Sequence, residues 1–180
     1  VAIGNVAQAT QIRATAVGNR ATATQDSASA YGNRANATAQ FATAIGDNTN
    51  AGAAAVAVGT HANATAQDSV AVGNNSNGSG INSIAIGKDS NATGNQALAM
   101  AAKANASGTQ SIAIGTDTNS SADATVAIGK TAQATGNAAV AVGSDAKALA
   151  QNTVAVGIHA KATNQRGVAV GTYSEATADN

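Results

Sequence analysis

The sequence predicts an all-β chain that folds as a parallel β-solenoid, and three observations support this prediction. A four-residue unit, which first occurs at residues 1–4, recurs thirteen times, spaced by 14 residues in every case but one. In most copies β-branched residues alternate with Ala, and this period of 2 indicates a strand. A second segment of period 2 follows each unit, with small side chains on one side and polar ones on the other. Repeats of this kind stack as coils along one axis.

The first element of each repeat is a short strand that ends at a marker glycine, as Val70-Ala71-Val72 ends at Gly73. We predict a structural role for these glycines, because a side chain there would collide with the turn or because the backbone needs a positive φ. Ala101 takes the marker position once. The marker glycines are Gly4, Gly18, Gly32, Gly46, Gly59, Gly73, Gly87, Gly115, Gly129, Gly143, Gly157 and Gly171.

The second element follows the glycine, and we expect a strand over the second to fifth residues after it. Small residues occupy the third and fifth positions, as Ala35 and Ala37 do, and polar residues occupy the second and fourth. One side of this strand is therefore expected to face the interior and the other side the solvent. Turns rich in Gly, Asn, Asp and Thr join the strands.

Stacking places neighbouring strands about 4.8 Å apart, so thirteen coils predict a rod on the order of 60 Å long. We expect the Val and Ile side chains of the first strand to face the interior, opposite the Ala and Ser of the second strand. The alternative, in which Val and Ile face outward, stays open. Neither side of the first strand carries charge, which predicts self-association of identical faces about a symmetry axis.

A period of 14 residues also equals two heptads, and Ala favours helix, so a coiled coil is the main alternative fold. It fails because a glycine in each repeat would cost a helix about 1 kcal/mol. The chain also lacks apolar residues at both a and d positions and alternating charges at e and g.

Composition excludes several classes of function. The 180-residue chain has no Cys, no Trp and one Phe, whereas a compact enzyme domain fills its interior with bulky apolar side chains. Nine basic residues balance nine acidic ones, so we expect no nucleic acid partner. The apolar runs are too short for a transmembrane helix, and we expect no direct membrane contact in this segment.

The segments Asn82-Ser83-Ile84-Ala85-Ile86-Gly87 and Gln110-Ser111-Ile112-Ala113-Ile114-Gly115 resemble the head repeat of trimeric autotransporter adhesins, the YadA-like family. The resemblance covers the whole chain and implies one head repeat domain over residues 1–180, folded as a left-handed β-roll of about 13 coils. It also implies a homotrimer on the bacterial cell surface, anchored in the outer membrane through segments that this sequence lacks. The implied function is attachment to host cells or to matrix proteins such as collagen, fibronectin or laminin, and bacterial self-association.

Some coils depart from this pattern, and we expect local irregularities there. Tyr31 stands at an Ile position, residues 98–101 lack the glycine, and the coil before Gly59 has 13 residues, which indicates a shortened turn.

No candidate catalytic or metal site emerges, and we expect no cofactor. His61 and His159 lie seven coils apart and are interpreted as surface residues. The Asp residues do not form the nonapeptide of calcium-binding solenoids, and no Ser, His and Asp converge. Thr recurs six residues after the marker, which suggests either ice binding or, as we favour, a ladder of hydroxyls that satisfies backbone groups.

The candidate ligand-binding residues are basic side chains expected to point outward: Arg20, Arg34, Lys103, Lys147 and Lys161. Two functional hypotheses remain open. In the first, the segment is an adhesive head whose surface contacts a ligand. In the second, it is a structural spacer of the adhesin fibre with no ligand of its own.

Overall fold

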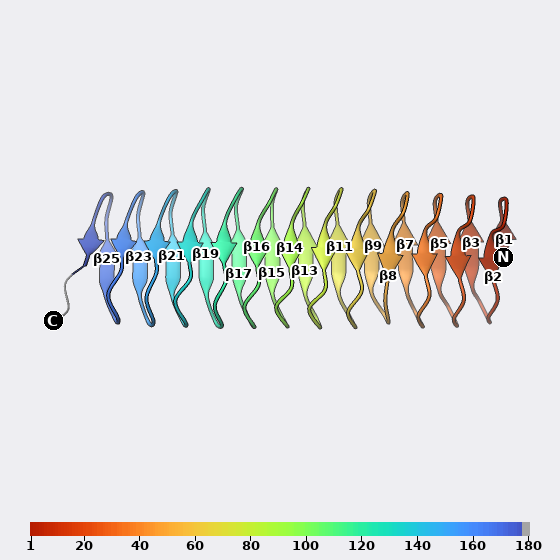
Figure 1. Cartoon of the computed structure of the whole chain (residues 1–180), viewed down its shortest axis with the longest axis horizontal. Coiled ribbons are helices and arrows are strands. Elements are labelled where there is room, and N and C mark those ends of the chain that lie inside the picture. Colours follow the sequence, from red (N-terminus) through yellow and green to blue (C-terminus); the bar gives the residue numbers. More distant parts are fainter. Residues whose placement is uncertain (178–180) are drawn as a thin grey trace. The chain divides into compact units, whose positions relative to one another are not determined.

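The structure, a computed structural model that describes residues 1–177, is an all-β parallel solenoid, as the repeat pattern predicts. Its 26 short strands alternate between two parallel sheets, and the described residues contain no helix (Figure 1). The odd-numbered strands form what we call the first sheet, and the even-numbered strands form the second sheet. Contacts divide the chain into two compact units, Val1–Asp89 and Ser90–Asn180. A single domain over residues 1–180 stays a prediction.

The strands of the first unit stack in sequence order within each sheet. Its first sheet contains β1 (Ala2–Ile3), β3 (Thr15–Val17), β5 (Ser29–Tyr31), β7 (Thr43–Ile45), β9 (Val56–Val58), β11 (Val70–Val72) and β13 (Ile84–Ile86). Its second sheet contains β2 (Gln8–Ala9), β4 (Thr22–Ala23), β6 (Asn36–Ala37), β8 (Asn50–Ala51), β10 (Asn63–Ala64) and β12 (Asn77–Gly78).

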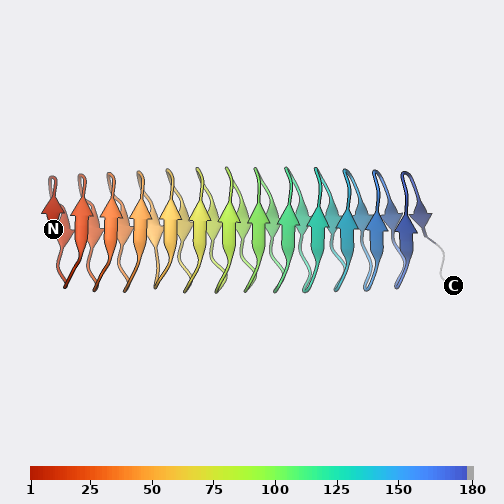
Figure 2. The same cartoon turned by 180° about the vertical axis from the view of Figure 1, so that it is seen from behind.

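The second unit has the same organisation, and Figure 2 shows its odd-numbered strands lying parallel and side by side. Its first sheet contains β15 (Leu98–Met100), β17 (Ile112–Ile114), β19 (Val126–Ile128), β21 (Val140–Val142), β23 (Val154–Val156) and β25 (Val168–Val170). Its second sheet contains β14 (Asn91–Ala92), β16 (Asn105–Ala106), β18 (Asn119–Ser120), β20 (Gln133–Ala134), β22 (Lys147–Ala148), β24 (Lys161–Ala162) and β26 (Glu175–Ala176).

The register places equivalent residues of neighbouring coils opposite each other. Ala71 pairs with Ala85 one coil later, and Val140 pairs with Val154. The 13-residue coil keeps this register, since Thr43 pairs with Val56. The turn after β8 is one residue shorter than in the other coils. It consists of Ala53 and Ala54, whereas the equivalent turn elsewhere has three residues, as in 39–41. The irregularity predicted there is thus confined to a turn.

The core consists of small side chains from both sheets. In the first unit, Ala71 of β11 is fully buried, and its neighbours Val70 and Val72 are partly exposed on the outer side. The second unit repeats this arrangement at Ala127, between Val126 and Ile128. The expectation that Val and Ile face the interior is therefore wrong. Ala and other small side chains from both sheets fill the interior, and the Val and Ile side chains of the first sheet lie on its outer side.

Buried Ser and Thr replace Ala at some core positions, and most of their hydroxyls are satisfied locally. The Ser69 hydroxyl donates to the carbonyl of Ala66 at 2.8 Å, and the Thr153 hydroxyl donates to that of Ala150 at 2.6 Å. Ser120 and Thr125 share a hydrogen bond of 2.7 Å between the two sheets of the second unit. Hydroxyls near a turn thus satisfy its carbonyls without widening the core.

Two turns close each coil. Turn A comprises the marker residue and the two residues after it, as in 32–34, and turn B precedes the next first-sheet strand, as in 39–41. Both contain a left-handed residue that is not glycine, for example Arg34 (φ 56°) in turn A and Phe41 (φ 59°) in turn B. Its amide donates to the preceding coil, as Arg34 does to the carbonyl of Asn19 at 2.8 Å. This stacking of turns compensates a left-handed conformation that costs about 1–2 kcal/mol.

The second-sheet strand is shorter than the sequence suggested. It spans only the fourth and fifth residues after the marker, as β6 does after Gly32. The second residue lies instead in turn A, where its left-handed conformation directs the chain into the strand.

Candidate functional site

Each coil presents three kinds of surface, and the first is an uncharged apolar face. We call the outer side of the first sheet the apolar face, because its described strands carry no charged residue. Its most exposed side chains in the first unit are Ile3, Tyr31, Ile45, Ile84 and Ile86. In the second unit they are Met100, Ile128, Val168 and Val170. Columns of exposed apolar residues on successive coils are typical of a surface that another molecule covers.

The outer side of the second sheet is polar and ordered by side-chain hydrogen bonds. Asn occupies the fourth position after the marker in seven consecutive coils, from Asn36 to Asn119. Their amides donate to the next coil: Asn63 to Asn77 at 3.0 Å in the first unit, and Asn105 to Asn119 at 2.8 Å in the second. We call this set the Asn column. The sequence indicates that these residues are polar and point outward, and the recurrence of Asn at one position is the pattern from which the ladder could have been predicted.

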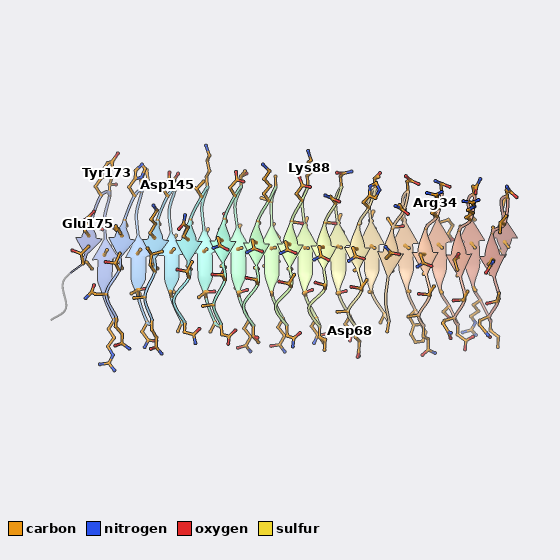
Figure 3. All side chains as sticks on the ribbon, in the orientation of Figure 1. Arg34, Asp68, Lys88, Asp145, Tyr173 and Glu175 are labelled. Carbon is orange, nitrogen blue, oxygen red and sulfur yellow. The ribbon has the colours of Figure 1, made fainter. Side chains whose placement is uncertain are left out.

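The edge formed by turn A carries most of the remaining charge. In the first unit, Arg34 and Lys88 project from this edge, and Asp68 projects from the opposite edge, formed by turn B (Figure 3). Asn33 donates to Asp47 at 2.7 Å across one coil. On this edge Arg20 and Arg34 are followed by Asp47, and Lys88 is followed by Asp89, so basic and acidic side chains are mixed and the edge offers local contacts rather than a strong field.

A polar and aromatic group lies on turn A of the second unit, at Thr131, Asp145, His159 and Tyr173. The Thr131 hydroxyl donates to the Asp145 carboxylate, and the His159 and Tyr173 rings stack with centroids 5.0 Å apart. The hydrogen bond from Thr131 is the main cause that lowers the pKa of Asp145, and attraction to His159 and Lys130 acts in the same direction. These residues hold each other in place as a column of the turn.

The five basic residues singled out in the sequence fall on two different surfaces. Arg20, Arg34 and Lys103 lie in turn A, with φ of 56° each, and are exposed. Lys147 and Lys161 are on β22 and β24 of the second sheet, where they pair directly. Placing all five on one strand face is therefore wrong for the first three. Arg20 and Arg34 occupy neighbouring coils, whereas Lys103 lies three coils before Lys147.

The marker glycines combine two constraints. Gly115 has φ +134°, and a Cβ there would lie 2.5 Å from the carbonyl oxygen of Gly129 on the next coil. Ala101 is accommodated at the same position with φ 106°. A side chain at Gly115 would therefore be strained by its own backbone and by its neighbour.

Among residues 1–177, no group of three or more His, Cys, Asp or Glu is placed to hold a metal ion. Within the same described range, no helix is long and apolar enough to cross a membrane. His61 and His159 are both exposed, as the sequence suggested.

The chain is similar to known proteins in two respects. A family model described as the YadA head domain repeat matches residues 1–21, 23–49, 51–76, 79–100, 106–132, 120–146, 134–160, 148–174 and 162–180. Among solved structures, the collagen-binding domain of the Yersinia adhesin YadA is 31% identical in sequence, with a TM-score of 0.48. The match covers 74% of this chain and 63% of that one, so the chain spans less than two thirds of that domain. The comparison with curated proteins gives no match.

The family model recurs from the first residue to the last, and the period it matches is the coil that the structure shows. The chain belongs to the family of YadA head domain repeats.

Proposed function

We propose that this chain is the head segment of a bacterial surface adhesin, in which three copies associate and present a shared surface to a ligand. The observation that carries the proposal is the contrast between the two sheets. The first sheet exposes an uncharged apolar face, and the second sheet and turn A expose polar and charged groups. Membership in the family of head repeats supports the adhesive role and the number of copies.

Association would remove the apolar face from water. Ile45 and Ile128, which lie on internal coils, are 40% and 37% exposed in the single chain, and most outward positions of the first sheet in each unit hold Val or Ile. Burial stabilises an assembly by about 25 cal/mol for each Å² of apolar surface removed from water, so small gains on many coils add up. Identical faces about a symmetry axis give a closed assembly.

The ligand would then meet the second sheet and turn A. The first pair of candidate contacts is Arg20 and Arg34 on turn A, and the second pair is Lys147 and Lys161 on the second sheet. Host cells, matrix proteins such as collagen, fibronectin and laminin, and other bacteria are the partners we propose. Three chains that repeat weak contacts would bind by avidity without a single strong site.

The test is solid-phase binding of the 180-residue chain to immobilised collagen, fibronectin and laminin at two salt concentrations. Binding by the parent is expected to fall at high salt, because exposed charge contacts are screened. The variant with Arg20, Arg34, Lys103, Lys147 and Lys161 all replaced by Gln should bind at least tenfold more weakly and depend less on salt. Replacement of Arg13 and Arg166, which lie on turn B, by Gln is the matched control.

Two results would change the proposal. Unchanged binding by the five-fold variant would remove the basic residues from the site. No binding by a correctly assembled parent to any of the three proteins or to host cells would favour the spacer hypothesis.

A further inference from the structure

The Asn column coincides with a chemical motif that the ladder alone does not require. Six of its members are followed two residues later by Ser or Thr, which gives the acceptor pattern for N-linked glycosylation. The six are Asn36, Asn63, Asn77, Asn91, Asn105 and Asn119, with Thr38, Thr65, Ser79, Thr93, Ser107 and Ser121 as their hydroxyl partners. We propose that these six asparagines are glycosylation sites.

Within each unit the fold places its three asparagines on one surface, the outer side of the second sheet: Asn36, Asn63 and Asn77 in the first unit, and Asn91, Asn105 and Asn119 in the second. Each Asn opens a strand of the second sheet with its side chain directed outward, and each Ser or Thr partner is exposed. Each Ser or Thr directly follows its two-residue strand, and in one motif the Asn77 amide donates to the Ser79 hydroxyl at 3.3 Å. The chain has one further motif of this kind, Asn74-Asn75-Ser76, but its Ser76 is fully buried in the core.

The folded chain constrains when the sugar is attached. The six asparagines are only partly exposed, and amides such as those of Asn63 and Asn105 already donate to the next coil. A transferase needs an amide nitrogen that makes no hydrogen bond to the next coil. It also needs the Asn-containing segment to be separated from the neighbouring strands of the second sheet. We therefore place the transfer on the unfolded chain, before the coils stack.

The transfer is a substitution at the anomeric carbon of an activated sugar, a glycosyl phosphate carried by a nucleotide or a lipid. The Asn Nδ2 forms a bond to C1 while the C1–O bond to phosphate breaks, and the phosphate leaves with the bonding electrons. A base of the transferase takes one Nδ2 proton. No oxidation or reduction is involved.

The product is compatible with the ladder. A glycosylated amide keeps its carbonyl oxygen and one N–H, and in the trans arrangement preferred by secondary amides this N–H points opposite to the carbonyl. A ladder of stacked amides uses these two groups, as in the 2.8 Å bond from Asn91 to Asn105. Since coils repeat about every 4.8 Å, sugars on neighbouring coils would stack, which favours single hexoses over branched glycans.

In the second unit the column divides into two parts. Asn91, Asn105 and Asn119 carry the motif, whereas Lys147 and Lys161 follow at the same position on later coils. Sugars would thus cover the second sheet around the three asparagines and leave Lys147 and Lys161 accessible to solvent. The inference does not depend on the ligand proposed above, because it rests on the acceptor motif and its placement.

Mass spectrometry of peptides from protein taken from the surface of cells that naturally produce it tests the proposal. We expect one hexose mass on asparagines of the six motifs and none on Asn50. This residue is an internal control, since it accepts a hydrogen bond from Asn36 in the same column but is followed by Ala51 and Gly52. All six unmodified, or Asn50 modified to the same extent, would overturn the proposal.

Two further measurements sharpen the test. In the producing cells, Ser107→Ala should abolish the sugar on Asn105 and leave Asn91 and Asn119 modified, while continued modification of Asn105 would contradict the motif. In vitro, an asparagine glycosyltransferase with UDP-glucose should modify the urea-unfolded chain, after dilution, at least tenfold faster than the folded one. Equal rates would overturn transfer before folding.

Discussion

Two buried serines of the first unit occupy equivalent core positions yet differ in their hydrogen bonding. The Ser69 hydroxyl donates to Ala66, whereas the Ser83 hydroxyl is buried and, among the described residues, has no hydrogen-bond partner. An unsatisfied buried hydroxyl costs free energy that a methyl group of similar size would not. Ser83→Ala should therefore raise the free energy of unfolding by about 1 kcal/mol, and Ser69→Ala should lower it by about 1 kcal/mol. Urea unfolding of both variants checks this, and shifts of the same sign would contradict it.

The carboxylate of Asp145 links stability to pH. Because its pKa is lowered in the folded state, Asp145 stabilises the fold above its unfolded pKa, and this stabilisation is lost as the pH falls through the folded value. Thr131→Val removes the main donor, so the pKa should rise toward the ordinary value of 3.8. NMR titration of the Asp145 carboxyl carbon measures the change. Thr135→Val, directly after β20, is the control, and equal pKa values in the two variants would show that Thr131 has no such role.

At the scale of the element, the marker position of turn A accepts a side chain poorly, because an added Cβ meets both a positive φ and the next coil. Gly115→Val should lower the free energy of unfolding by roughly 3 kcal/mol, and Gly115→Ala by less, because both strain and collision follow from the added Cβ. Gly171 is the matched control, since it has φ +120° but no atom within 4 Å of an added Cβ. Gly171→Ala should therefore be milder than Gly115→Ala. Equal thermal unfolding midpoints for all variants and the parent would contradict the role of the glycines.

The sequence predicts an element correctly where its residue pattern is compatible with only one structure. The 14-residue period determines the stacking register, so that Ala71 pairs with Ala85, and the glycine locates turn A. The direction of Val70 and Val72 could not be predicted, because both sides of β11 are apolar and uncharged. Arg34 lies in turn A and not in the expected strand for a similar reason. The alternation of polar and small residues begins at Arg34, before the strand, so the pattern does not reveal that Arg34 has a left-handed conformation. The Asn ladder consists of hydrogen bonds between neighbouring coils, and the residue pattern within a single repeat does not predict such bonds.

At the scale of the whole molecule, the apolar face predicts an assembly. Sedimentation equilibrium at micromolar concentration should give three times the chain mass of 17.1 kDa. Val142→Glu together with Val156→Glu, on the outer side of the first sheet, should give a monomer, because buried carboxylates without partners oppose association. Gln133→Glu, on the second sheet, should remain trimeric. A well-folded monomeric parent with a β-type circular dichroism spectrum would exclude the assembly.

The pairing of each residue with its equivalent one coil later has a consequence for how such a chain changes length over generations. Within the second unit, Ile112 pairs with Val126 and Val126 pairs with Val140. Loss of one 14-residue coil would let the flanking coils meet with the same partners and the same register, and a duplication would add one by the same rule. A gain or loss of any other number of residues must be absorbed in a turn, as the 13-residue coil does at Ala53 and Ala54. Genes for such chains can therefore lengthen or shorten by recombination between repeats, while the surface chemistry of every remaining coil is inherited unchanged.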